Sequence, residues 1–282
     1  MNRRNGSRSE GAPRLLLIGG RARSGTTLLR DLCNLHPEIS LTHEFGTFMG
    51  LNEPYPAYRD HIVGLWRAQP ILFCRIMRTR RMNRRLSSWA LSMRGHVFAL
   101  RYLRRIRRYG PGPIDLPAIQ ATLAELLPGA AFVGDKNPEY VHLLDRLAPT
   151  NGLSTVVIYR DCRDATSSYL KLARTTWRDK PWIRYSDTAE KIATRWVDAV
   201  EKMERHRDRI HVVRYEDLVQ DPLPVLTNLA EWLGLDPEGF AARDLTFVHA
   251  KNIGKHGHGL TEREVEDVLR VAGSTMARLG YT

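Results

Sequence analysis

The chain has 282 residues, of which 43% are hydrophobic, and a net charge of +12. This length and composition are enough to bury a core without stapling, and three widely spaced cysteines exclude a disulfide framework or a zinc site. The polar first 14 residues contain no apolar core of the kind that a signal peptide needs, and no later apolar run approaches membrane-spanning length. We therefore expect a cytoplasmic protein with a disordered tail over residues 1–13.

The positive charge is concentrated in one block. Residues 61–114 contain 13 arginines and no Asp or Glu. A basic block suits nucleic acid or an anionic surface, but a nucleic-acid-binding chain usually spreads its charge more widely. A solvated helix surface in a protein that uses arginine in preference to lysine accounts for the block equally well, so both interpretations stay open.

Short apolar segments alternate with longer amphipathic ones along the chain. Strands are predicted at residues 14–19, 131–134, 154–159 and 210–214, with a further strand before Glu44. Helical patterns follow these strands, an alternation typical of a parallel sheet covered by helices on both faces. We therefore predict a three-layer α/β/α fold with a central parallel sheet, in one domain over residues 14–282.

A mainly helical, arginine-rich insert is predicted at residues 52–130. Within it, one side of a helix is predicted to be apolar and the other cationic. The apolar side comprises Val97, Leu100, Leu103 and Ile106, with Tyr102 and Tyr109 nearby, and the cationic side comprises Arg101, Arg104, Arg105, Arg107 and Arg108. Such a helix would cap the core, contact a membrane surface or line the cleft for a substrate.

The chain is predicted to close with a helix over residues 261–279. Thr261 and Glu264 have the spacing of a capping box, in which each side chain bonds to the other residue's backbone N–H.

The strongest local signal is the glycine-rich turn GRARSGTT at residues 20–27, between a strand and a helix. Gly20 and Gly25 let several backbone N–H groups and the helix N-terminus converge on one anionic group. The turn is P-loop-like, but Thr26 occupies the place of the Walker A lysine, which argues against a kinase or ATPase. Arg23 offers a different cation. An ordinary glycine turn is the alternative.

The turn and a second segment, IYRDCRDATSS at residues 158–168, resemble the two nucleotide-binding elements of sulfotransferases that use 3′-phosphoadenosine 5′-phosphosulfate (PAPS). The resemblance implies that Arg160 and Ser168 hold the 3′-phosphate. It also implies that the turn holds the 5′-phosphosulfate, through Arg23, Ser24, Gly25, Thr26 and Thr27. Without the glycine-rich turn, an Arg-Asp pair at a strand end, here Arg160 and Asp161, is more often a structural ion pair than a ligand site.

The resemblance also implies catalytic residues, and it is closest to the tyrosylprotein and heparan-type branch and to soluble bacterial sulfotransferases. Glu44, in SLTHEFG, stands where that branch has its general base, and His43 is the alternative base. Lys136, in GDKNP, would stabilise the leaving oxygen together with Arg23. The alternatives are that Glu44 is an ordinary surface glutamate and that Lys136 lies in an ordinary Asn-Pro turn.

Two further residues are assigned by the same resemblance. Tyr215, in VRYEDL, falls where an aromatic ring helps to hold the nucleotide, although a core tyrosine is an equal alternative. Lys255, in the glycine-rich basic segment AKNIGKHGHG, is the candidate for a loop closing over the 3′-phosphate.

The resemblance as a whole implies a bacterial-type enzyme that moves a sulfuryl group from PAPS to a hydroxyl without a metal, leaving adenosine 3′,5′-diphosphate. The acceptor is expected to be a small or lipid-linked molecule such as a secondary metabolite or glycolipid. No nucleic acid partner is expected, whereas block 61–114 is a candidate contact for the acceptor or an anionic membrane. A nucleotide kinase and a basic nucleic-acid- or membrane-binding protein are the competing hypotheses.

Overall fold

The computed structural model describes residues 11–68 and 88–282. The first ten residues of the predicted tail, Cys74 and the arginines between positions 69 and 87 lie outside the described residues. Within the described ranges, no helix combines the length and apolarity that a membrane crossing requires.

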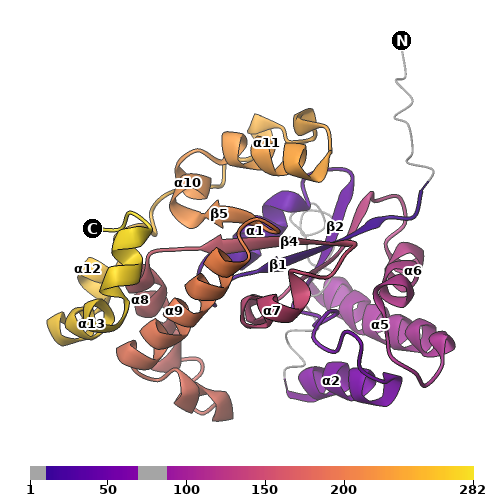
Figure 1. The fold of residues 1–282 in the computed structure, drawn as a ribbon, viewed down its shortest axis with the longest axis horizontal. Coiled ribbons are helices and arrows are strands. Elements are labelled where there is room, and N and C mark those ends of the chain that lie inside the picture. The colour runs from indigo at the N-terminus through magenta and orange to yellow at the C-terminus, as the bar shows by residue number, and fades with distance from the viewer. Residues whose placement is uncertain (1–10, 69–87) are drawn as a thin grey trace. The chain divides into compact units, whose positions relative to one another are not determined.

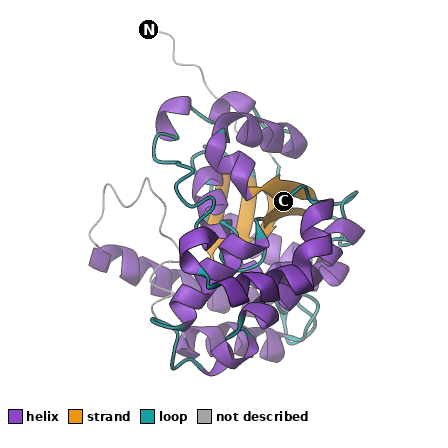
Figure 2. Ribbon diagram, turned by 90° about the vertical axis from the view of Figure 1, so that its left-hand side faces the viewer, coloured by secondary structure: helices purple, strands orange, loops and turns teal. Residues whose placement is uncertain are grey.

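Five strands form a parallel sheet in the order β2-β3-β1-β4-β5 (Figures 1 and 2). The strands are β1 (Arg14–Gly19), β2 (Ile39–His43), β3 (Phe132–Lys136), β4 (Leu153–Tyr159) and β5 (His211–Arg214). The predicted parallel sheet and α/β/α class are confirmed. β3 begins one residue later than predicted and continues to Lys136, which pairs in register with His43 of β2.

The chain divides into two compact units. The first contains the residues up to Leu17, Arg30–Lys136 and Asn151–Ser154, and the second contains Ile18–Leu29, Asn137–Thr150 and Thr155–Thr282. The single domain predicted over residues 14–282 stays a prediction, and each unit is described by itself below.

The first unit is built on the helices α2 (Tyr55–Ala68), α5 (Ser88–Ile106) and α6 (Leu116–Leu126), with the 3₁₀ turn η1 (Arg107–Tyr109) after α5. Helices α5 and α6 pack against each other (Figure 1). The aromatic ring of Phe45 lies edge-on against the rings of Phe98 and Tyr102 of α5, with centroid separations of 5.3 and 4.9 Å. This contact fixes the rotation of α5 about its own axis.

That rotation corrects the predicted apolar side of the helix. The buried side comprises Phe98, Ala99, Tyr102 and Ile106, whereas Val97 and Leu100 face outward and Tyr109 is exposed. The prediction was wrong for Val97 and Leu100 because two apolar stripes run along α5. Packing of the aromatic side chains Phe98 and Tyr102 buries more apolar surface than packing of Val97 and Leu100 would, and it decides which stripe turns inward.

The second unit contains α8 (Cys162–Ala173), α9 (Ala189–Arg205) and α13 (Glu262–Arg278), which lie side by side (Figure 1). Trp196 of α9 is almost fully buried in their common core and donates from Nε1 to the carbonyl oxygen of Arg160 at 2.9 Å. The predicted closing helix is confirmed as α13, and both hydrogen bonds of the Thr261–Glu264 capping box are present.

The remaining helical elements are short or lie beyond β5. They are α7 (Leu144–Leu147), α10 (Tyr215–Gln220), α11 (Pro222–Leu233), α12 (His256–Gly259) and the 3₁₀ turns η2 (Pro138–Leu143), η3 (Pro181–Tyr185), η4 (Pro237–Gly239) and η5 (Ala242–Asp244). Helix α1 (Thr26–Cys33) begins inside the glycine-rich turn, so Thr26 and Thr27 form its first two positions.

Candidate active site

The glycine-rich turn at residues 20–27 lies in the second unit and leaves no room for side chains at its two glycines. A Cβ at Gly20 would approach the backbone oxygen of Ile158 to 2.3 Å. At Gly25, where φ is +94°, a Cβ would lie 2.5 Å from Cδ2 of Tyr215. The turn is therefore packed directly on β4 and on the Tyr215 ring, and both glycines are required by close approach of neighbouring atoms.

Four of the predicted nucleotide-binding residues meet in this unit. The Nη1 of Arg160 donates to the carbonyl oxygen of Arg23 at 3.3 Å, and the Nε of Arg23 donates to Oγ of Ser168 at 3.0 Å. The Arg160 guanidinium also lies 4.5 Å from the centroid of the Tyr215 ring. Tyr215 is buried, so it is a core residue that at the same time supports the turn and Arg160.

Asp164, which sequence reasoning did not select, organises the neighbourhood of Arg160. Its carboxylate is 1% exposed and lies 3.2 Å from Nη2 of Arg160. It also accepts hydrogen bonds from the backbone N–H groups of Gly254 and His256, each at 2.9 Å, and contacts Nδ1 of His256 at 2.9 Å. Arg160 itself donates to the carbonyl oxygen of Asn252.

These contacts attach the segment around residues 252–256 to the start of α8. Burial opposes ionisation of Asp164, but the hydrogen bonds from His256 and Gly254 and the charge of Arg160 together lower its pKa. The spacing of Asp164, four residues after Arg160, was the signal that sequence reasoning missed. Lys255 lies in the attached segment, but its exposed side chain forms no hydrogen bond or ion pair with a described residue.

The two arginines of the glycine-rich turn have different surroundings. Arg23 is exposed with a positive φ of 76°, whereas Arg21 is buried and donates from Nη2 to Oγ of Ser186 at 3.2 Å. Arg21 also lies over the ring of Tyr169. Burial lowers the pKa of Arg21. Arg21 therefore ties the turn to the segment that follows η3, and Arg23 is the arginine that faces solvent.

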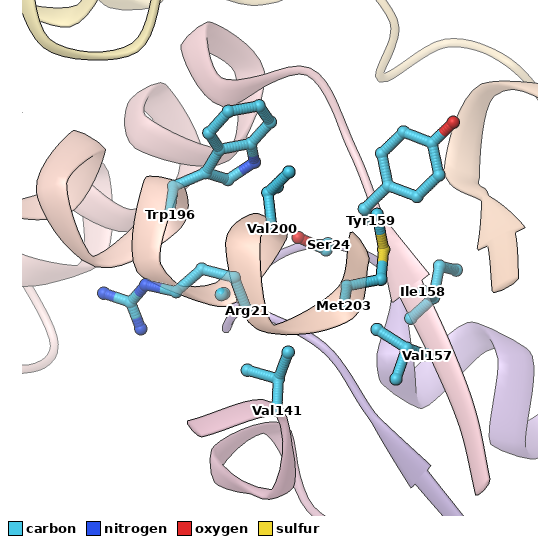
Figure 3. A pocket seen from close by; sticks show the side chains of 10 residues that line it. Arg21, Ser24, Val141, Val157, Ile158, Tyr159, Trp196, Val200 and Met203 are labelled. Carbon is cyan, nitrogen blue, oxygen red and sulfur yellow. The ribbon is translucent and has the colours of Figure 1, made fainter. Parts of the chain in front are cut away.

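A small cavity lies next to Arg21 and Ser24 (Figure 3). Most of its lining consists of apolar side chains of β4 and α9, among them Val157, Trp196 and Met203. An apolar lining does not suit a charged nucleotide, so this cavity is not part of the binding site.

The polar atoms around the turn do fit an anionic group. The buried Oγ of Ser24 and the buried Nε of Arg160 have no hydrogen-bond partner among the described residues. An unpaired buried hydroxyl or guanidinium N–H costs free energy, and an anion that accepts from it removes that cost. Both atoms belong to residues that the sequence assigned to phosphate binding.

The first unit contains three of the candidate catalytic residues, Glu44, His43 and Lys136. The side chain of Lys136 is fully buried at the end of β3, and its Nζ donates to Oε1 of Glu44. Nε2 of His43 lies 4.0 Å from the same carboxylate oxygen. Burial lowers the pKa of Lys136, and the charge of Glu44 opposes that shift. Glu44, His43 and Lys136 thus form one cluster, and neither candidate base is eliminated.

Asp135 holds the turn that contains Glu44, and sequence reasoning missed this residue as well. Its buried carboxylate accepts hydrogen bonds from the N–H groups of Phe45, Gly46 and Thr47 at 3.2, 2.7 and 2.9 Å. Glu44 has a φ of +51°, a strained value for a residue with a side chain. The three hydrogen bonds stabilise this backbone conformation, which directs Glu44 to Lys136. The sequence signal that could have identified Asp135 is an acidic residue at the end of a strand.

The central strand β1 of the parallel sheet runs into a glycine-rich turn and a helix, and an arginine element follows its neighbour in the sheet, β4. This arrangement defines an α/β protein of the P-loop type. The chain belongs to the sulfotransferase family, whose family model matches residues 14–239.

Solved structures of sulfotransferases share the fold. The sulfotransferase domain of the Synechococcus PCC 7002 olefin synthase aligns with a TM-score of 0.56 and 21% identity, covering 93% of this chain and 94% of that domain. The sulfotransferase domain from the curacin biosynthetic pathway gives 0.53 and 17%, covering 97% and 99%. Sulfotransferase STF9 from Mycobacterium avium gives 0.52 and 16%, covering 96% and 78%. Comparison with curated proteins yields no match.

Proposed function

We propose that this sulfotransferase uses PAPS as donor and transfers its sulfuryl group to an acceptor hydroxyl by in-line displacement. The observation that supports the donor most directly is the hydrogen bond from Arg160 to the carbonyl oxygen of Arg23. It joins the two elements to which we assign anion binding and which lie far apart in the sequence, as one nucleotide with phosphates at its 3′ and 5′ positions requires.

The residues present fit such a donor. Arg23, Ser24, Gly25, Thr26 and Thr27 would hold the 5′-phosphosulfate, and Arg160 and Ser168 the 3′-phosphate. Tyr215 packs against both the glycine-rich turn, at Gly25, and Arg160. The exposed Lys255 would add a cation on the segment that Asp164 anchors.

The chemistry that we assign to Glu44, Lys136 and Arg23 is a proton transfer and the stabilisation of a leaving oxygen. Glu44 would accept the proton of the acceptor hydroxyl as its oxygen forms a bond to sulfur. The bond between sulfur and the bridging phosphate oxygen breaks, and Lys136 and Arg23 would stabilise the negative charge on that oxygen. His43 is the alternative proton acceptor.

Ligand-dependent thermal denaturation tests the donor. The protein is melted alone, with adenosine 3′,5′-diphosphate, with ATP and magnesium, and with a short oligonucleotide. Sulfuryl transfer from PAPS predicts magnesium-independent stabilisation by the first ligand, about 2.7 kcal/mol at a hundredfold excess over its Kd. Stabilisation only by ATP with magnesium would instead indicate a kinase, and stabilisation only by the oligonucleotide a nucleic-acid-binding protein.

The acceptor is tested by incubating the enzyme with PAPS labelled in the sulfuryl group and panels of alcohols, glycolipids and phenols. We expect labelled product from at least one hydroxyl compound and none from amines of matched shape. Transfer to amines alone would contradict the assignment of a hydroxyl acceptor.

A further inference from the structure

Helix α5 presents an apolar stripe to solvent although its opposite side is already packed. Met93, Val97 and Leu100 are 44%, 36% and 59% exposed. Their spacing of four and three residues places them in one row along the helix. On the other side, Phe98 and Tyr102 contact Phe45, and the hydroxyl group of Tyr102 bonds to that of Tyr58 at 2.6 Å. The exposed row therefore cannot turn inward without breaking this packing.

Arginines surround the exposed row. Arg104 continues it by one turn, and Arg94 and Arg101 lie along its edge. All three are exposed, and none forms an ion pair with a described residue. Arg105 and Arg108 differ, because both form ion pairs with Glu125 of α6. The outward side of α5 is thus an apolar row bordered by uncompensated positive charge.

The segment that contains the helix has no acidic residue of its own. Residues 61–114 contain no Asp or Glu, so no carboxylate of this segment opposes the arginines. A surface with these two properties is complementary to a partner that is negatively charged at its boundary and apolar just beneath it. Phosphate headgroups over acyl chains have that order of layers, whereas a nucleic acid backbone offers no apolar layer to Leu100 or Met93.

We propose that the outward side of α5 docks onto anionic lipid bilayers. Met93, Val97 and Leu100 enter the boundary between headgroups and acyl chains, while Arg94, Arg101 and Arg104 contact lipid phosphates. Three apolar side chains alone give weak binding, so anionic lipid is required and attachment is reversible. This inference stands independently of the donor and the acceptor proposed above.

Vesicle co-sedimentation tests the proposal with the full chain. Wild-type protein is mixed with vesicles of phosphatidylcholine alone or with a quarter of phosphatidylglycerol, at 0.1 and 0.5 M NaCl. We expect sedimentation with the anionic vesicles at low salt and its loss at high salt, because screening shortens the reach of the arginine charges. The double variant Arg101→Gln/Arg104→Gln should bind at least about tenfold more weakly. Leu100→Ser should bind about threefold to tenfold more weakly.

Matched control variants lie in the second unit. Arg243 and Arg263 are exposed and form no ion pair with a described residue, so Arg243→Gln/Arg263→Gln makes the same change in net charge. Leu269 is 45% exposed on α13, which makes Leu269→Ser the control for Leu100→Ser. Both controls should bind vesicles within about twofold of wild type. Val97→Ser is a second test of the apolar row.

Three results would overturn the proposal. The first is equal sedimentation of wild type with neutral and anionic vesicles, or with neither. The second is loss of binding in the control variants to the same degree as in the α5 variants. The third is that vesicle binding weakens in Arg101→Gln/Arg104→Gln but is unchanged in Leu100→Ser and Val97→Ser, which would indicate that surface charge alone attracts the vesicles. If oligonucleotide binding is lost in parallel, the arginines are assigned to nucleic acid. Unchanged melting temperatures verify that every variant is folded, and stabilisation by adenosine 3′,5′-diphosphate reports separately on the donor site.

Discussion

The guanidinium of Arg160 donates a hydrogen bond to the carbonyl oxygen of Arg23, 137 residues away in the chain. The same guanidinium lies over Tyr215 and forms an ion pair with Asp164. Arg160 is therefore held on several sides before any ligand binds. Such preorganisation reduces the loss of side-chain conformational entropy when a phosphate binds.

Arg160→Lys tests this relationship. Lysine keeps the positive charge next to Asp164, but a single ammonium does not reproduce the planar fork that contacts Arg23, Asp164 and Asn252. We expect the affinity for adenosine 3′,5′-diphosphate to fall by roughly tenfold to a hundredfold, measured by isothermal titration calorimetry. Arg263→Lys, at an exposed position, should bind like wild type. Equal affinity in both variants would remove Arg160 from the donor site.

Glu44→Gln tests the candidate base. Glutamine retains the size of the side chain but is not an effective proton acceptor, so turnover should fall about a hundredfold to ten-thousandfold. Binding of adenosine 3′,5′-diphosphate should change little, because Glu44 is not one of its proposed ligands. Initial rates with labelled PAPS and calorimetry separate the two effects. If turnover persists in Glu44→Gln and is lost in His43→Gln, His43 is the base.

Lys136 predicts a pH dependence of stability in the Glu44→Gln variant. Burial lowers the pKa of Lys136 in the folded protein below its ordinary value of 10.5, and loss of Glu44 removes an interaction that opposes this shift. The unfolded chain then binds the proton more tightly, so the free energy of unfolding should rise with pH up to about 10.5, by at most about 1.4 kcal/mol per pH unit.

Urea denaturation between pH 7 and pH 9.5 provides the measurement. The double variant Glu44→Gln/Lys136→Met is the control, because it retains every other titrating group. The free energy of unfolding should rise more steeply in Glu44→Gln than in this control. Parallel pH curves would show that Lys136 does not titrate differently in the folded and unfolded states.

Asp164 predicts a pH dependence of the same sign, but in the acidic range. Its pKa in the folded protein lies below the ordinary value of 3.8, so its stabilising contribution is present above pH 3.8 and is lost as the pH falls through the lower folded value. Asp164→Asn should be less stable than wild type at pH 7 by about 2–4 kcal/mol, since Arg160 loses its buried partner. The difference should shrink below pH 4 in urea denaturation, whereas a constant difference would point to a purely steric effect.

Gly20→Ala and Gly25→Ala should differ in severity. The added methyl group at Gly20 meets the backbone oxygen of Ile158, which cannot rotate away, whereas at Gly25 it meets the side chain of Tyr215. We expect a larger fall in the free energy of unfolding for Gly20→Ala, by about 1 kcal/mol or more. Adding Tyr215→Ala should reduce the cost of Gly25→Ala in a double-mutant cycle. Additive costs would show that the ring does not limit the turn.

The sequence alone determined the strands, the closing helix and the glycine-rich turn, because each depends on interactions between residues close in the chain. β-branched runs, the capping box of Thr261 and Glu264, and the paired glycines are local signals. Arg23 and Arg160 lie in recognisable motifs, so the sequence likewise predicted that they bind one nucleotide.

Only the tertiary structure decided which polar groups support these residues. Asp135 and Asp164 act through partners on other elements, the N–H groups after β2 and those of the segment at residues 254–256. The inward side of α5 was also undetermined, since its two apolar stripes look equivalent until Phe45 contacts one of them. The physical reason is common to all three cases: the deciding free energy comes from burial and hydrogen bonding between distant segments, and periodicity along one segment contains no information about which neighbour it will meet.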